Sequence, residues 1–407
     1  MANKTFEYAV RDRSGKVVKG RIDAPNQAAV ANRLKQMGLA PMSIAEVQNT
    51  GLQREITIPG FEEKVRLKDL AVMARQLATM ISAGLTLLRA LSILAEQTES
   101  KPLAKVLAQV RNDVEQGQAL STALGKHKDV FPPLMTNIVR AGETGGFLEQ
   151  ALQSVATNYE AEVKLRAKIK SAMTYPVVVF VMAIVAVGAM LMFIVPVFAQ
   201  MFADLDSELP APTQFLVDLS GAMRFIAPVM LVALVAGALW WRKNKHEEAV
   251  RAKVDPWKLK LPVFGPLFQK VAIARFTRNF GTMLGAGVPI LQALDIVGDT
   301  AGNWVIEEAI RDVQQSVRTG NALSTPLAMH EVFPPMVVQM LAVGEDSGAM
   351  ETMLTKISDF YDEEVETTTE QLTSLLEPMM IAFLGIIVGG MIIALYMPIF
   401  SIMDAIR

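Results

Sequence analysis

Two matching stretches decide the fold of this chain: RQLATMISAGLTLLRALSIL at residues 75–94 and RNFGTMLGAGVPILQALDIV at residues 278–297. They superpose when the sequence is shifted by 203 residues, with nine of the twenty positions identical, and this shift carries Gly84 onto Gly287. Agreement over a run of this length indicates an internal duplication. The sequence is therefore expected to contain the same structural unit twice.

The duplication extends from these stretches toward the C-terminus. GQALSTALGKH (117–127) matches GNALSTPLAMH (320–330) at seven of eleven positions. After a deletion of one residue the shift becomes 202, and FPPLMTNIVRAGETGG (131–146) matches FPPMVVQMLAVGEDSG (333–348). The prolines and glycines that this shift pairs include Pro132 with Pro334, Gly142 with Gly344, and Pro176 with Pro378.

Each copy is expected to form a bundle of short antiparallel helices. Apolar residues recur at helical spacing between residues 70 and 94, so each helix has an apolar stripe that it must bury on its neighbours. Gly84 and Gly287 are expected to interrupt consecutive helices, and the Phe-Pro-Pro sequences at Phe131 and Phe333 to begin another helix. The fold class is thus mainly α.

Three apolar stretches are long enough to span a membrane, which takes roughly 20 helical residues. They occupy residues 176–202, 225–241 and 378–403, and the first and third contain no charged residue. Buried core helices are the alternative, but such long charge-free runs are rare in soluble proteins. A mean hydropathy of +0.31 beside 20% charged residues agrees with a chain divided between lipid and water. The stretches lack ionisable residues at depth, unlike most ion pathways.

Basic residues flank these segments asymmetrically, which predicts their orientation. Lysines and arginines precede the first segment and follow the second, whereas the loop 203–224 is acidic except for Arg224 at its edge. The N-terminus is therefore expected inside the cell and the C-terminus outside. The second segment then allows both copies to lie on the cytosolic side.

A different unit precedes the first copy. FEYAVRDRSGKVVKGRIDA predicts two strands around a Ser14-Gly15 turn, followed by a helix that ends at Gly38 and a strand near Ala40 to Val47. No cleavable signal peptide is expected, because the N-terminus lacks an apolar core. The predicted domains are 1–48 (small α/β), 49–64 (linker), 65–175 (bundle 1), 176–202 (membrane), 203–224 (outer loop), 225–241 (membrane), 242–267 (connector), 268–377 (bundle 2) and 378–403 (membrane).

The sequence offers no recognisable catalytic, cofactor or metal site. G-x-x-x-x-G-K-[ST] does not occur, so any ATP-derived energy is expected from a partner. The chain has no cysteine and three histidines, of which His127 and His330 are repeat-equivalent and are expected to have a structural role. A net charge of −2 argues against direct binding of nucleic acid.

Glu143 and Glu345, which are repeat-equivalent, are the best polar candidates for a contact with a partner. The alternative is a structural carboxylate, placed at a helix start by the macrodipole or paired with a base such as Arg140. A second acidic group, Asp362-Glu363-Glu364 with Glu366 and Glu370, has two interpretations of its own: it binds a cation or a basic partner, or it is a solvated helix face.

These motifs, in this order and spacing, resemble the polytopic inner-membrane platform protein shared by type IV pilus and type II secretion machines. The resemblance covers the whole chain and is most specific at Gly84 and Gly287, the Phe-Pro-Pro sequences, Gly142-Glu143, Gly344-Glu345, Pro176 and Pro378. One departure is Asp346-Ser347-Gly348 in the second copy, where the first has Thr144-Gly145-Gly146.

The resemblance implies a non-catalytic, homo-oligomeric platform in the lipid of the cytoplasmic membrane. Such a platform contacts a cytosolic hexameric ATPase, pilin or pseudopilin subunits and other inner-membrane assembly proteins, and helps to move pilins into a filament. A transporter or channel subunit is the competing hypothesis, although transporter repeats usually place their sites at the bilayer midplane. A receptor is disfavoured by the short outer loop.

Overall fold

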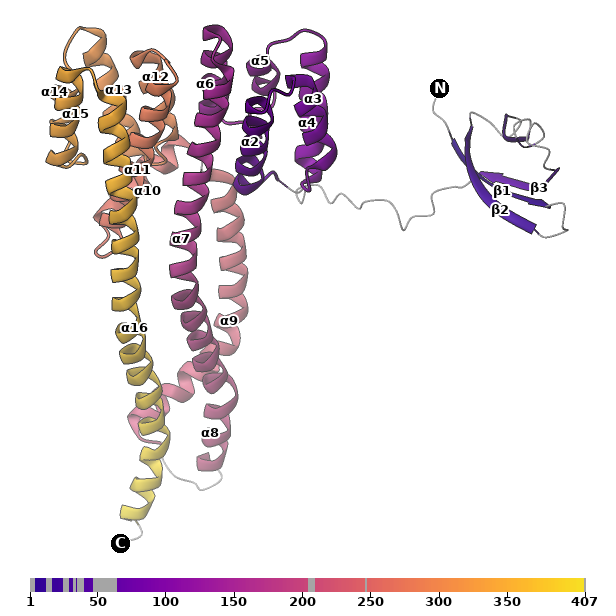
Figure 1. The fold of residues 1–407 in the computed structure, drawn as a ribbon. Coiled ribbons are helices and arrows are strands. Elements are labelled where there is room, and N and C mark those ends of the chain that lie inside the picture. The colour runs from indigo at the N-terminus through magenta and orange to yellow at the C-terminus, as the bar shows by residue number, and fades with distance from the viewer. Residues whose placement is uncertain are drawn as a thin grey trace. The chain divides into compact units, whose positions relative to one another are not determined.

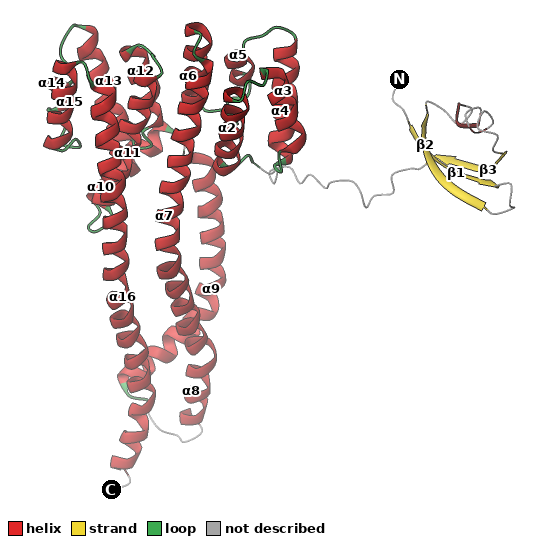
Figure 2. Ribbon diagram, viewed as in Figure 1, coloured by secondary structure: helices red, strands yellow, loops and turns green. Residues whose placement is uncertain are grey.

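The computed structural model divides the chain into two units, Met1–Lys64 and Val65–Arg407, each of which is described by itself. Figures 1 and 2 show their elements. The predicted linker 49–64 lies outside the described residues except for Lys64. The structure describes residues 4–11, 17–24, 29–31, 34, 40–46, 64–203, 209–245 and 247–405.

The first unit contains a three-stranded antiparallel sheet of β1 (Lys4–Arg11), β2 (Val17–Ala24) and β3 (Ala40–Glu46), in the order β2-β1-β3. Residues 29–31 and 34 are helical. The predicted strands are therefore confirmed, while the Ser14-Gly15 turn and Gly38 lie outside the described residues.

The second unit consists of helices, and the duplication is visible in their order. Repeat 1 contains α2 (Leu67–Ser82), α3 (Leu87–Gln97), α4 (Lys101–Glu115), α5 (Leu120–Gly125), α6 (Pro133–Gly145) and α7 (Leu148–Ala189). Repeat 2 contains α11 (Gly265–Gly285), α12 (Ile290–Thr300), α13 (Trp304–Arg318), α14 (Ser324–Leu327), α15 (Pro335–Ser347) and α16 (Met350–Ala405). Between them lie a π-helical segment η1 (Met190–Ile194), α8 (Val195–Ala203), α9 (Ala211–Asn244) and α10 (Glu248–Lys260).

The predicted helix boundaries in the bundles agree with this order. Gly84 and Gly287 have φ angles of 83° and 69° in the turns that end α2 and α11, a conformation that glycine adopts without steric cost. Pro132 and Pro334 stand immediately before α6 and α15. Both Phe-Pro-Pro sequences therefore begin a helix, as expected.

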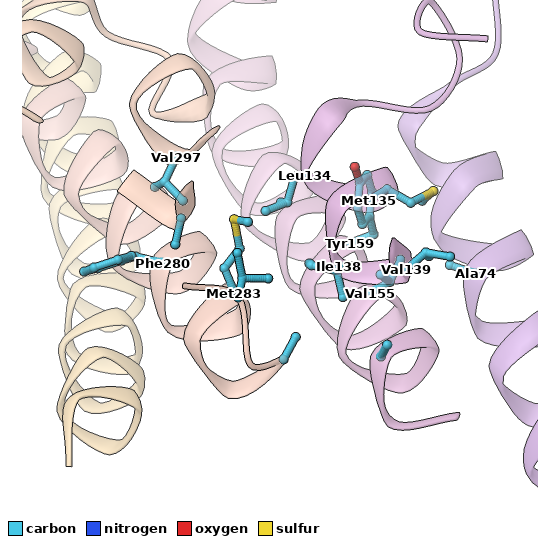
Figure 3. Close-up of a cluster of buried hydrophobic side chains, with 14 of the residues drawn as sticks. Ala74, Leu134, Met135, Ile138, Val139, Val155, Tyr159, Phe280, Met283 and Val297 are labelled. Carbon is cyan, nitrogen blue, oxygen red and sulfur yellow. The ribbon is translucent and has the colours of Figure 1, made fainter. Parts of the chain in front are cut away.

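One apolar core runs through both bundles instead of two separate cores. Side chains of α6 and α7 belong to the same buried cluster as side chains of α11 and α12. Figure 3 shows Leu134 and Ile138 of repeat 1 facing Met283 of repeat 2, and all three are at most 5% exposed. The two repeats therefore pack as a single body.

The last helix of each repeat continues from its bundle into the apolar segment. α7 passes through Pro176 and α16 through Pro378 without ending, so the predicted boundaries at 175/176 and 377/378 are not breaks in the backbone. α7 and α16 pack side by side and run in the same direction (Figure 1). Among the described residues, three helical stretches are long and apolar enough to cross a membrane: Leu148–Phe202, Ala211–Asn244 and Met350–Pro398.

The segment predicted as outer loop, 203–224, is largely helical. Residues 204–208 are outside the described part, but α9 begins at Ala211 and continues without a break through the second apolar segment. Its first turns bury Thr213, Leu216 and Ser220, which lie on one face of the helix. The loop is thus shorter than expected because this amphipathic stretch packs on η1, α8 and α16.

Two hydroxyl groups on that face bind carbonyls that membrane prolines leave free. Proline has no N–H, so Pro398 cannot bond the carbonyl of Ala394 one turn before it, and the hydroxyl of Thr213 donates to that carbonyl. Pro196 follows the π-helical segment and likewise has no N–H to donate to the carbonyl of Leu191. That carbonyl accepts a hydrogen bond from Ser220 Oγ at 2.5 Å. Such bonds are needed in lipid, where water cannot supply them.

Candidate partner-contact site

Glu143 lies in the last turns of α6 and binds the start of the neighbouring helix α5. Its Oε1 accepts a hydrogen bond from the backbone N–H of Leu120 at 2.5 Å, and its Oε2 accepts from that of Ser121 at 2.9 Å. The first N–H groups of a helix have no partner within the helix and carry its positive dipole end. Both oxygens of this carboxylate are thus used within the bundle.

Glu345 makes the equivalent contact in repeat 2, with longer bonds. Its Oε1 accepts from the N–H of Leu323 at 2.7 Å, while its Oε2 lies 3.3 Å from both the N–H and the hydroxyl oxygen of Ser324. The helix that it caps, α14, has only one turn. Both repeats therefore use a glutamate to bind the start of a short helix, and the hydrogen bonds are shorter in repeat 1.

This geometry differs from both structural alternatives that the sequence offered. Glu143 stands near the end of its own helix, not at a start, and the helix start that it stabilises belongs to another element. Arg140 donates to Asn137 Oδ1 instead of forming an ion pair with Glu143. A contact of Glu143 or Glu345 with a partner protein stays a prediction, because each side chain is only partly buried.

The glycine before each glutamate allows α6 or α15 to pack closely on the long helix. A Cβ added at Gly142 would lie 2.4 Å from the Cβ of Ala151 and 3.1 Å from the Cα of Leu148. At Gly344 the nearest atom would be Cγ of Met353 at 2.9 Å, which belongs to a flexible side chain. Each glycine thus fixes the position of the glutamate that follows it.

Both helices that carry these glutamates end in the same turn. Gly146 and Gly348 are left-handed, with φ angles of 76° and 70°, and close α6 and α15. The departure at Asp346-Ser347 leaves the left-handed conformation of the closing glycine unchanged, although the N–H of Gly146 binds the carbonyl of Gly142 and that of Gly348 binds the carbonyl of Glu345.

A repeated ion pair joins the first helix of each bundle to its long helix. Arg75 of α2 donates from Nε and a terminal nitrogen to the two carboxylate oxygens of Glu160 of α7, each at 2.6 Å. The repeat-equivalent residues Arg278 and Asp362 form the same pair between α11 and α16. Sequence inspection paired Arg75 with Arg278 but did not identify their acidic partners.

Glu160 is expected to contribute stability that depends on pH. The hydrogen bonds from Arg75 hold the pKa of Glu160 below its ordinary value of 4.5, so the folded protein retains the charged form at lower pH than the unfolded chain does. The contribution is full above pH 4.5 and is lost as pH falls through the lowered pKa. Because the pair is exposed, its size is about 0.2–1 kcal/mol.

The check is the unfolding midpoint of the full-length protein in detergent, measured at several pH values. Glu160→Gln should lower the midpoint at pH 7, and the difference from the wild type should shrink toward zero as pH falls below 4.5. A difference that stays constant with pH would contradict this assignment. Glu149→Gln, at an exposed carboxylate on the same helix, is the control.

Three residues of the acidic group on α16 form ion pairs in the part of the helix that belongs to the bundle. Lys270 binds Glu364 at 2.7 Å, Lys168 of α7 binds Glu366, and Asp362 pairs with Arg278. Within the described residues no group of three or more His, Asp or Glu side chains is arranged to hold a metal ion. His330 Nε2 lies 3.6 Å from Asp312, beside the helix that Phe333-Pro334 begins.

Family models match both repeats and the first unit. The model described as type II secretion system protein F matches residues 73–196 and 276–398, and the model of that protein's N-terminal domain matches residues 1–45. The chain belongs to the type II secretion system protein F family. The two matched ranges coincide with the duplication found in the sequence, and each includes one bundle together with its long helix.

Full-length relatives in this family carry two kinds of name. A type IV pilus assembly protein PilC from Thermus thermophilus is 46% identical, covering 98% of each chain, and one from Myxococcus xanthus is 44% identical, covering 100% of this chain and 97% of the relative. A type II secretion system protein F from Vibrio cholerae is 33% identical over 97% of each chain. Pilus and secretion proteins therefore share this architecture from end to end.

The structure adds residues that inspection of the sequence overlooked in this family member. Thr213 and Ser220 gave no motif because their partners are main-chain carbonyls on other helices. Glu160 and Asp362 could have been recognised as repeat-equivalent acids, since the 202-residue shift that aligns the long helices places one on the other. This equivalence was overlooked because many other charged residues surround both positions.

Proposed function

We propose that this protein is the inner-membrane platform of a type IV pilus machine, which couples a cytosolic hexameric ATPase to the insertion of pilin subunits into the filament. The observation that carries the proposal is the end-to-end similarity to relatives named for type IV pilus assembly, at 46% and 44% identity. The lower identity of 33% to a type II secretion protein favours a pilus over secretion of proteins.

The structure supports a mechanical role for the two long helices. α7 and α16 extend without a break from the cytosolic core into the apolar region, so a displacement of the bundles moves the membrane segments as well. Because the repeats share one core, an ATPase that binds either repeat would move both as one rigid body. The membrane segments then engage the apolar helices of pilins and other inner-membrane assembly proteins.

The proposed orientation places the bundles and the N-terminal domain in the cytosol and the C-terminus outside. Lysine and arginine residues concentrate on the bundle side of the first two segments. Glu143 and Glu345 are proposed to position α5 and α14, and through them the loops that meet the partner. In this role a carboxylate acts through the helix that it caps.

The platform is proposed to be non-catalytic. The competing hypothesis, a transporter or channel subunit, requires polar groups at the membrane midplane, whereas residues 176–202 and 378–403 contain no charged side chain. Flux of solutes through liposomes that contain only the purified protein would favour the competing hypothesis.

Deletion of the gene is expected to abolish surface filaments, and expression of the full-length chain to restore them. The measurement is electron microscopy of filaments together with co-purification of a cytosolic hexameric ATPase from detergent-solubilised membranes. A deletion strain that keeps its filaments but fails to export proteins would assign the platform to a type II secretion machine instead of a pilus machine. Normal filaments together with normal secretion would contradict the proposal.

A further inference from the structure

A polar cleft of about 330 Å³ lies between the repeats, where α7 of repeat 1 meets α11 and α16 of repeat 2. α11 packs on both long helices, so each of the three helices forms one wall of the cleft (Figure 1). The α7 wall contributes hydroxyl and amide groups, and the α16 wall contributes three carboxylates, those of Glu351, Asp359 and Asp362. Among the described residues, none that lines the cleft has a large apolar side chain.

Two of the three carboxylates have no basic partner. Asp362 pairs with Arg278 on the α11 wall, and Nη1 of this arginine also lies 3.9 Å from Oε2 of Glu162. The carboxylates of Glu351 and Asp359, both at exposed positions, form no ion pair or hydrogen bond within the described part of the chain. The cleft therefore has an excess of negative charge, which attracts a cationic ligand.

A buried hydroxyl group in the same cleft also has no partner. Ser358 lines the cleft and is only 3% exposed, yet its hydroxyl makes no hydrogen bond to any residue that the structure describes. Buried polar side chains are hydrogen-bonded in the large majority of cases, so an exception of this kind points to a bond supplied from outside the chain. Ser358 thus marks a place for a donor beside the free carboxylates.

Repeat 1 has neither the hydroxyl nor the second carboxylate at the equivalent positions. The 202-residue shift places Ser358 on Ala156 and Asp359 on Thr157. The two repeats share their helices and their turns, so the fold itself does not require these two polar groups in repeat 2. The difference favours a role of Ser358 and Asp359 in binding over a role in packing.

A glycine on α11 gives the carboxylate of Glu351 its place. A Cβ added at Gly285 would lie 2.6 Å from Oε1 and 2.8 Å from Cδ of Glu351. The repeat-equivalent residue on α2 is Ser82, which has a Cβ. The carboxylate of Glu351 therefore lies directly against the backbone of α11, where a side chain would otherwise stand.

The spacing of the two free carboxylates selects the ligand. Glu351 and Asp359 are eight positions apart on α16, which places them about 12 Å apart along the helix axis. One metal ion cannot bind both, because carboxylate oxygens coordinate calcium at about 2.3–2.6 Å. An extended chain with an ammonium group at each end reaches both when it contains about nine bonds, since each bond advances the chain by about 1.25 Å.

We propose that this cleft binds a linear polyamine of the spermidine class. One terminal ammonium group binds Glu351, and the other binds Asp359 and donates a hydrogen bond to Ser358. The hydroxyl groups of Ser154 and Thr157 on the α7 wall face the same ligand. A bound amine thus contacts helices of both repeats, and it should raise the unfolding midpoint because the unfolded chain has no such site.

Calorimetric titration of the full-length protein in detergent measures the binding. The probes are spermidine, 1,8-diaminooctane and 1,4-diaminobutane, of which the first two have terminal nitrogens nine bonds apart and the third only five. Spermidine and 1,8-diaminooctane should bind severalfold more tightly than 1,4-diaminobutane, which cannot reach both carboxylates. The proposal is overturned if spermidine shows no saturable binding, if the two diamines bind equally well, or if Mg²⁺ displaces spermidine at the same concentration.

Charge-neutral variants locate the site. Glu351→Gln and Asp359→Asn should each weaken the binding of spermidine severalfold and remove the preference for the longer diamine. The matched control is Glu363→Gln, at an exposed carboxylate of α16 that does not line the cleft. An equal loss of affinity in Glu363→Gln would show that the amines respond only to the general charge of the helix, which overturns the site.

Ser358→Ala separates binding from stability. The hydroxyl has no hydrogen bond to lose, so the variant should keep the unfolding midpoint of the ligand-free protein and bind spermidine severalfold more weakly. A lower midpoint with unchanged binding would make the hydroxyl a structural group and overturn its assignment.

Lysine side chains of another protein offer the same ammonium groups as a free polyamine. If spermidine does not bind the purified protein, while Glu351→Gln abolishes co-purification of another protein, the cleft receives those lysines and the proposal of a free polyamine is overturned. The inference does not rest on the proposed function, because a chain that binds no polyamine can still support filaments.

Discussion

Replacing Glu143 by glutamine is expected to loosen the start of α5 and to destabilise the first bundle by about 1–3 kcal/mol. The carboxylate accepts from the N–H groups of Leu120 and Ser121, at 2.5 and 2.9 Å. Glutamine has nearly the same shape but offers only one accepting oxygen, and its NH₂ group would face a second donor. One partly buried N–H therefore loses its partner, and the charge at the positive end of the helix is lost.

Hydrogen exchange of the full-length protein in detergent measures this effect. Exchange should increase in the segment 117–127, which contains the start of α5, and stay unchanged in the repeat-equivalent segment 320–330. Glu345→Gln should produce the mirror result with a smaller increase, because its bonds reach 3.3 Å. Unchanged exchange in both variants, combined with loss of filaments, would assign the two glutamates to direct partner contact.

Replacing Gly142 by alanine is expected to have the second large effect, since the new methyl group has no space. Its Cβ would lie 2.4 Å from the Cβ of Ala151 and 3.1 Å from the backbone Cα of Leu148. α6 must then move away from α7, and overpacking of this kind costs about 1–3 kcal/mol. We expect a lower unfolding midpoint and less protein in the membrane.

Two controls separate this close packing from a general intolerance of alanine. Gly344→Ala should be milder, because the nearest atom belongs to the side chain of Met353, which can move. Adding Ala151→Gly to Gly142→Ala removes the opposing methyl group and should recover part of the stability. If the double variant is as unstable as the sum of the single ones, the methyl contact is not the cause.

The sequence was sufficient to predict the duplication, the bundles and the three apolar helices. These features are periodic or long, and Gly84 and Gly287 mark turns that only a residue without a Cβ adopts readily. The continuity of α7 through Pro176 was not predictable in the same way, because proline interrupts most helices and its tolerance depends on the surroundings. The amphipathic start of α9 was mistaken for a loop, since its apolar face is short.

For the candidate site, the sequence predicted the residues but not the groups that they bind. The matching Gly-Glu pairs singled out Glu143 and Glu345, but their partners are backbone groups of other helices, about twenty positions earlier in the chain. A backbone N–H has no signature in the sequence.

The bonds that α9 makes to the two proline-bearing helices link the repeats at the end opposite to their shared core. Thr213 and Ser220 stand two turns apart on one face of α9; Thr213 binds a carbonyl of α16, and Ser220 binds one of η1, which continues α7. If α7 slid past α16, one of these carbonyls would lose its hydrogen bond in a hydrocarbon environment, at a cost of several kcal/mol. We therefore expect α9 to tie the two proline-bearing helices together at this end, so that a tilt of one carries the other with it.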